Sequence, residues 1–204
     1  METLIITDGN IEFPRCTSYM LIESTNTLDI LLTTVESALI SHPCIRLVVF
    51  VGGNLDVMVK AYELSQFTSN SEKLIETLVI PFIINLQRLE SLCYQANAKL
   101  LVSELQPIPK FLQNLKNLGT ERQYVLHRIY CETSRWILKF NAQVTRNPPN
   151  FFERLFRERK QGSGSLLRVI RVGKYVSTYK LVTNMQDLIV THILKYIRKE
   201  FDIH

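Results

Sequence analysis

The chain has 204 residues, of which 46% are hydrophobic and 21% are charged. This balance supplies enough apolar surface for a domain with a buried core and excludes disorder for most of the chain. No run of 18 apolar residues occurs, so no membrane-spanning helix is expected, and the acidic first ten residues do not resemble a signal peptide. We therefore expect a single domain over residues 1–204.

The first half of the chain predicts strands that alternate with helices. Short apolar runs at 4–7, 45–51 and 99–105 read as strands, and each ends in a turn or in a proline-containing loop. Apolar residues at helical spacing predict helices at 27–40 and from Ser71, taken as an N-cap, with a kink or two abutting helices at Pro81. The alternation predicts the α/β class, as a three-layer α/β/α sandwich with a central mostly parallel sheet.

The second half is less regular. Residues 119–144 predict a long amphipathic helix, and residues 187–201 predict a closing helix with Lys and Arg in its last turns. Between them lie a basic irregular insertion at 145–165, which ends in the flexible joint QGSGS, and a predicted strand at 166–172. The side of the long helix expected to face the core carries Tyr124, Val125, Ile129, Trp136, Ile137 and Phe140.

The four cysteines are scattered and show no C-x-x-C spacing. Scattered cysteines of this kind are typical of reduced, packed thiols in a cytoplasmic or nuclear protein, and we expect a cytoplasmic protein. Because locally spaced ligand pairs are missing from the sequence, neither a zinc site nor a cofactor is expected.

Charge is distributed unevenly along the chain. Residues 1–105 hold 6 Lys and Arg against 12 Asp and Glu, whereas residues 106–204 hold 18 against 7. Residues 146–180 alone contain nine basic residues and two acidic ones. This asymmetry indicates a surface suited to an anionic partner, although Lys and Arg also serve simply to solvate a surface.

The run at 45–51 stops at Gly52-Gly53-Asn54, where glycines permit a tight bend and an amide can donate hydrogen bonds. Ligands of parallel α/β sheets bind at the carboxyl ends of the strands. A site is therefore expected where this segment meets the end of the first strand.

The order of elements resembles the SGNH (GDSL-type) hydrolase family. The resemblance is carried by LIITDGNI at 4–11, VGGNLDV at 51–57, KLLVSELQPIP at 99–109, the long helix through Trp136 and the final helix. The Gly-Gly-Asn segment is similar to the family block whose Gly and Asn donate to an oxyanion. The resemblance thus implies the fold and a pocket at its strand ends.

The residues that this family uses for catalysis do not appear at the matching positions. The family requires a nucleophilic Ser after the first strand and an Asp-x-x-His pair before the last helix. Residues 7–10 contain neither Ser nor Cys, and residues 179–186 contain neither Asp nor His. We expect no esterase activity, no catalytic residue and a vestigial pocket, formed by Asp8, Gly9, Asn10, Gly53 and Asn54.

The chain resembles most the non-catalytic domains of this fold. Among them are the Oskar-type domain of insect germ-plasm proteins and modules of retroelement proteins. This resemblance implies RNA binding through a basic surface and assembly into RNA–protein particles. The composition agrees, because cations that neutralise phosphates lie among aromatic residues that can stack on unpaired bases. The residues expected to bind nucleic acid are Arg154, Arg157, Arg159, Lys160, Arg168, Arg171 and Lys174.

Two other functions remain open. Asp8, Asp56 and Glu104 follow predicted strands, and converging carboxylates hold Mg²⁺ or Mn²⁺ in metal-dependent nucleases; LIITDGN is also similar to the start of PIN-type nucleases. Alternatively, the basic segment docks an acidic protein and the chain is a pure protein-interaction module.

Overall fold

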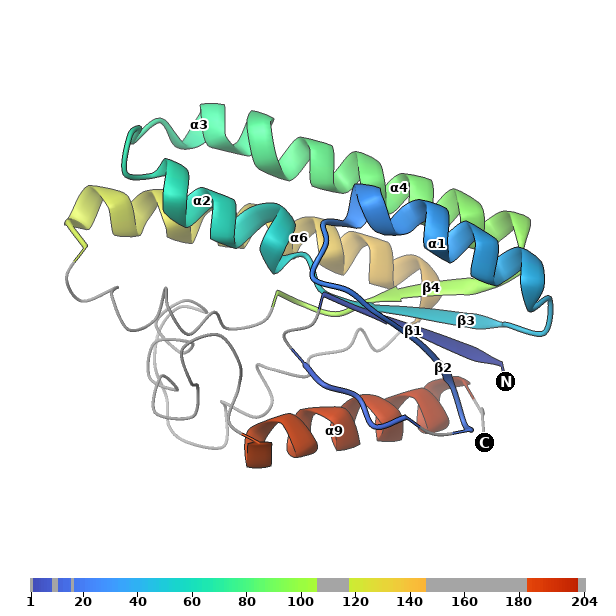
Figure 1. The fold of residues 1–204 in the computed structure, drawn as a ribbon. Helices are drawn as coiled ribbons and strands as arrows, with labels where there is room; N and C mark the ends of the chain where they lie inside the picture. The colour runs from blue at the N-terminus through green and yellow to red at the C-terminus, as the bar shows by residue number, and fades with distance from the viewer. Residues whose placement is uncertain (1, 9–10, 16, 106–117, 146–182, 202–204) are drawn as a thin grey trace.

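Four parallel strands form the centre of the structure, a computed structural model that describes residues 2–8, 11–15, 17–105, 118–145 and 183–201 (Figure 1). In spatial order the strands are β2 (Met20–Glu23), β1 (Thr3–Thr7), β3 (Leu47–Val51) and β4 (Lys99–Val102). The α/β class and the parallel sheet predicted from the sequence are confirmed.

The two inner strands are the most apolar ones. Every residue of β1 and β3 is buried, as continuous hydrophobic runs in a parallel sheet require. The edge strand β2 was not predicted, because its four residues are half-buried or exposed and show no strong pattern. The third predicted strand is shorter than expected and ends at Val102.

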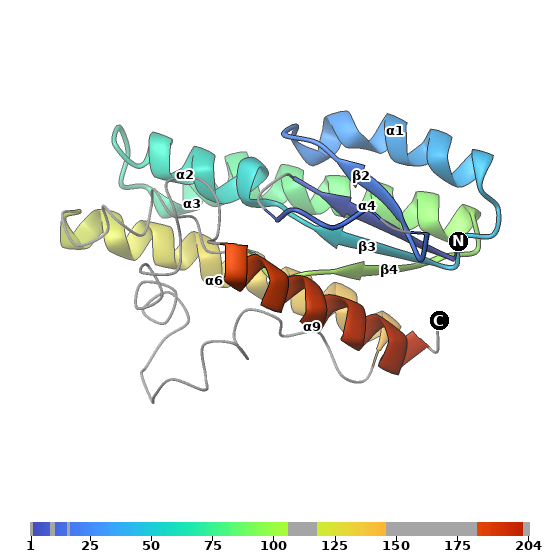
Figure 2. The ribbon, with the colours of Figure 1, turned by 60° about the horizontal axis from the view of Figure 1, so that its bottom comes forward.

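Helices cover the sheet from both sides. The helices α1 (Leu28–Ser41) and α4 (Ile80–Gln95) pack together on one face, and α9 (Thr183–Phe201) lies against the other (Figures 1 and 2). The long helix α6 (Thr120–Val144) packs along β4 and extends past the strand ends towards α2 (Val59–Leu64) and α3 (Ser71–Leu74). Among the described residues, no helix is both long and apolar enough to cross a membrane.

The helix predicted from Ser71 begins one residue differently, and it is divided near Pro81 as the sequence led us to expect. The N-cap of α3 is Asn70, not Ser71: its side chain accepts the Lys73 N–H at 3.0 Å. Near Pro81 the chain forms the π-helical turn η2 (Ile75–Val79), which α4 then follows. Because proline lacks an N–H and its ring crowds the preceding turn, a wider turn just before Pro81 relieves the conflict.

The apolar side of α6 also differs from the prediction in part. Val125, Ile129, Ile137 and Phe140 are buried and belong to the core. Tyr124 is 62% exposed, however, so its position at the edge of the apolar stripe does not bring it into the core.

The free edge of β4 is held by one side chain of α6. The Asn141 side-chain oxygen accepts the Val102 N–H at 2.9 Å, and its amide nitrogen donates to the Val102 carbonyl at 2.6 Å. Asn141 is buried and thus pairs with the strand as a neighbouring strand would. This contact fixes α6 against the sheet.

Candidate functional site

The carboxyl ends of β1 and β3 bring together three residues predicted for the pocket. Thr7 pairs with Val51 in the sheet, and the next residue, Asp8, donates its N–H to the Val51 carbonyl at 3.4 Å. Gly53 and Asn54 follow β3 at the same edge, and all three predicted residues are buried. Gly9 and Asn10, also predicted for the pocket, lie outside the described residues.

Both glycines of this edge are required by close packing. A Cβ atom on Gly52 would lie 3.2 Å from the Asp8 Cβ and 3.0 Å from the Phe50 ring. Gly53 has φ +99°, and a Cβ there would lie 2.7 Å from the Phe82 Cζ. The double glycine therefore brings the end of β3 against β1 and α4, a packing role that holds whatever the site binds.

Asn54 is the unusual residue of the site. It begins the π-helical turn η1 (Asn54–Met58), its side chain is 0% exposed, and neither of its polar side-chain atoms has a hydrogen-bond partner among the described residues. A buried amide without partners costs about 1–3 kcal/mol. Asn54 therefore weakens the fold, and π-helical turns are frequent at functional sites.

Asp56 has a structural role that the sequence did not reveal. Its carboxylate oxygens accept the Leu28 N–H at 3.0 and 3.2 Å, so that Asp56 caps the first turn of α1 from a distant part of the chain. The expected convergence of Asp56 with Asp8 and Glu104 on a metal is thus wrong for Asp56, whose carboxylate is turned to the start of α1. In the described ranges no three His, Cys, Asp or Glu side chains form a metal-binding group.

Burial raises the pKa of Asp56 to about 6, against the opposing effects of the Leu28 hydrogen bond and the positive charge of Lys60. The folded state therefore binds this proton more tightly than the unfolded chain does. We expect the free energy of unfolding contributed by Asp56 to be highest below pH 4 and to fall by up to about 3 kcal/mol in total as the pH rises from 4 to above 6.

This pH dependence is measured by urea unfolding at pH 4, 5 and 6.5 of the wild type and of the Asp56→Asn variant. The difference between the two proteins isolates Asp56 from the other titrating carboxyls. Parallel pH profiles would show that the Asp56 carboxyl does not carry the effect.

The seven basic residues predicted to bind nucleic acid, Arg154, Arg157, Arg159, Lys160, Arg168, Arg171 and Lys174, all lie outside the described residues. The same is true of the predicted strand at 166–172 and of the loop at 106–109. Their contribution to an anion-binding surface stays a prediction.

The cysteines only partly follow the prediction of packed thiols. Cys93 is buried, and this burial raises its pKa to about 12, so the thiol stays protonated. Cys44 is exposed, contrary to the prediction, because it lies in the turn between α1 and β3 rather than in either element. Cys131 is half-buried, with Sγ 3.6 Å from Nε2 of His127 one turn earlier on α6.

Sequence reasoning also missed Asn141. Its signal was present, because an amide beside Phe140 interrupts the apolar stripe of α6 at a position that faces the core. A buried polar residue in such a stripe requires hydrogen-bond partners, which here are the backbone groups of β4.

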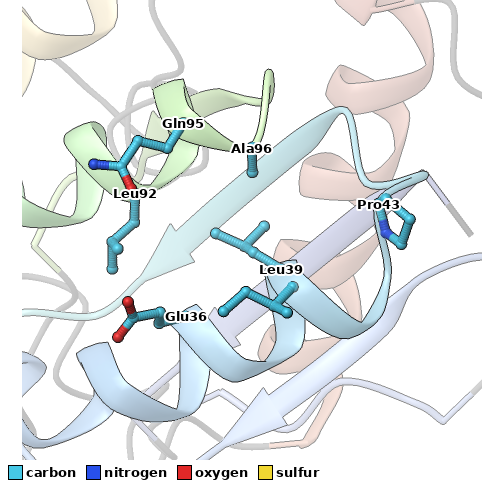
Figure 3. A pocket seen from close by; sticks show the side chains of 7 residues that line it. Glu36, Leu39, Pro43, Leu92, Gln95 and Ala96 are labelled. Carbon is cyan, nitrogen blue, oxygen red and sulfur yellow. The ribbon is translucent and has the colours of Figure 1, made fainter.

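A shallow apolar groove of about 340 Å³ lies away from the strand-end site, between the carboxyl ends of α1 and α4 (Figure 3). Leu39 and Ile40 line it from α1, Leu92 lines it from α4, and Ile40 is 75% exposed. Glu36 and Gln95 form its polar border.

The strand ends thus bring a carboxyl group and a buried amide to one edge of the sheet. The Thr7 hydroxyl donates to the Ile11 carbonyl at 3.3 Å.

No protein-family model matches the chain, and a comparison with curated proteins finds no significant match. Its function must therefore be argued from its own residues.

Proposed function

We propose that this chain is a non-enzymatic RNA-binding module of the cytoplasm, with an SGNH-hydrolase-like three-layer fold. The observation that carries the proposal is the excess of nine basic over two acidic residues in 146–180. Cations in such number release the counterions condensed on a nucleic-acid backbone, which supplies most of the affinity of sequence-independent binding.

The strand ends support the non-enzymatic part of the proposal. Residues 7–10, where the related hydrolases carry their nucleophile, read Thr-Asp-Gly-Asn, and residues 179–186 supply neither Asp nor His. The buried amide of Asn54 and the two glycines could bind a ligand, but without a nucleophile and a base they could not catalyse its hydrolysis. The function would then lie on the cationic surface, and the chain would act as part of an RNA–protein assembly.

The experiment that tests this proposal is charge reversal in the basic segment. The triple change Arg157→Glu, Arg159→Glu and Lys160→Glu is expected to weaken RNA binding by about tenfold or more, because each reversed cation loses a phosphate contact. Since surface changes alter stability by about 0.5 kcal/mol or less, the melting temperature is expected to stay nearly unchanged. Filter binding to a labelled single-stranded RNA measures the affinity.

The matched control reverses three exposed cations on other elements, Lys60, Lys73 and Arg88, and so produces the same change in net charge. RNA affinity that is unaffected by the first triple change, or equally affected by both, would contradict the assignment of the basic segment. A wild-type protein that retains no RNA in a salt-dependent manner would instead indicate a module that binds protein partners.

A further inference from the structure

The cations of the described residues differ in the partners that their side chains contact. On α6, Arg122 donates to the Ser65 hydroxyl at 2.7 Å and to the Tyr62 carbonyl at 2.6 Å, and its guanidinium lies 4.8 Å from the Tyr62 ring centre. Arg128 of the same helix donates to Ser71 and Glu72. These arginines join α6 to neighbouring helices, so they are structural residues.

Five other cations form no side-chain hydrogen bond or ion pair with the described residues. Arg46, Lys99, Lys195, Arg198 and Lys199 are all exposed, and in the described part of the chain no carboxylate oxygen lies within 4 Å of any of their charged nitrogens. We call this group the amino-edge cations, because two of its members stand at or just before the first residue of a strand. Among these five, Lys99 contacts another element, through the ring of Phe201 on α9.

The fold brings the backbone at Arg46, the start of β4 and the last turn of α9 to one corner of the structure, although these segments are far apart in the sequence. The Lys99 N–H donates to the Arg46 carbonyl at 2.8 Å, so the first residue of β4 lies beside the residue that precedes β3. The Lys99 ammonium lies 5.7 Å from the ring centre of Phe201, in the last turn of α9. Figures 1 and 2 show this end of α9 beside the starts of the strands, and Arg198 and Lys199 belong to the same last turn.

The orientation of α9 leaves its charges facing outward. Val190, Ile193 and Ile197 are buried in the core, whereas Lys195, Arg198 and Lys199 are exposed. Because the apolar side of α9 is already covered by the protein, this helix cannot insert that side into a lipid surface. The helix dipole favours Arg198 and Lys199 near the helix end, but it does not account for Arg46 and Lys99 on the sheet.

Like charges gathered in this way repel each other, and an anionic partner relieves the repulsion. We propose that the amino-edge cations bind the phosphate backbone of RNA, as a second contact surface apart from residues 146–180; this inference rests on the proposed function. The charged groups of this surface are the side chains of Lys and Arg, whose natural partners on RNA are the phosphates. The contact is therefore made to the backbone and is independent of sequence.

The test compares two double variants in the full chain with equal changes in net charge. Arg198→Glu with Lys199→Glu alters the proposed surface, and Lys73→Glu with Arg88→Glu alters exposed cations of α3 and α4. Fluorescence anisotropy of a labelled single-stranded RNA is recorded from 50 to 200 mM salt. For the first variant we expect the slope of log affinity against log salt to become shallower by about 1.4, since each lost phosphate contact contributes about 0.7.

The control variant is expected to keep the wild-type slope. If both double variants keep it while the wild type binds RNA, the inference fails and the proposed function stands. If the wild type binds no RNA, both fail, and binding to vesicles that contain phosphatidylserine would then assign the cations to a membrane. Should Arg198→Glu with Lys199→Glu lower the melting temperature, the neutral pair Arg198→Ala with Lys199→Ala is used, with the same expected change in slope.

Discussion

Replacing Asn141 with Leu is expected to lower the free energy of unfolding by about 3–5 kcal/mol, because a buried backbone group left without a partner costs about 1–3 kcal/mol. The Leu side chain has nearly the shape of Asn but cannot replace the two hydrogen bonds to the Val102 N–H and carbonyl. Chemical unfolding in urea, followed by circular dichroism, measures the loss.

Two further variants sharpen this test. Gln143→Ala removes an exposed amide from the same helix and is expected to change stability by about 0.5 kcal/mol or less. Asn141→Asp keeps an acceptor for the Val102 N–H but loses the donor to its carbonyl, so its stability should increase as pH falls and the carboxyl becomes protonated. A Leu variant as stable as the Gln143→Ala control would show that Asn141 does not hold the edge of β4.

Replacing Gly53 with Ala is the second change with a large expected effect, a loss of about 2–4 kcal/mol in the free energy of unfolding. Part of the loss is backbone strain, because φ is +99° and a non-glycine residue there costs about 1–3 kcal/mol. The rest comes from the Cβ, which would lie 2.7 Å from the Phe82 ring and force that buried side chain to move. Thermal unfolding and urea unfolding both measure this loss in the free energy of unfolding.

Gly119→Ala is the matched control, because a Cβ at Gly119 meets no atom within 4 Å and φ there is −58°. It should leave the stability within about 0.5 kcal/mol of the wild type. Phe82→Leu should cost less stability in the Gly53→Ala background than in the wild type, because relief of the clash offsets part of the cost of the smaller core side chain. Equal stabilities of the Gly53→Ala and Gly119→Ala proteins would contradict the packing described at the end of β3.

The sequence predicted the inner sheet because its signals are local. A continuous apolar run that stops at a double glycine is typical of a strand buried on both faces, and β3 is such a strand. The strand β2 could not be predicted in this way, because it is short, half-buried and stabilised by pairing with β1 rather than by its own pattern. Tyr124 shows the opposite error, since it has the spacing of a core residue but lies on the exposed side of α6.

The candidate site was predictable in position but not in chemistry. From the predicted strand ends and the glycines, we expected Asp8, Gly53 and Asn54 at one edge of the sheet, and the structure has them there. The role of Asp56 depends on its contact with Leu28, 28 residues earlier, and no local pattern encodes such a contact. The same holds for Lys99, which is an isolated cation in the sequence and meets the end of α9 only in the folded chain.

We propose above that the cationic half of this chain binds RNA through its phosphates. The most direct test of this proposal is a salt titration of the wild-type protein with single-stranded RNA, read by fluorescence anisotropy. We predict that log affinity falls linearly with log salt, with a slope of about −0.7 for each phosphate contacted and therefore of −3 or steeper for about five contacts. No binding at 50 mM salt, or an affinity that does not change with salt, would contradict the claim.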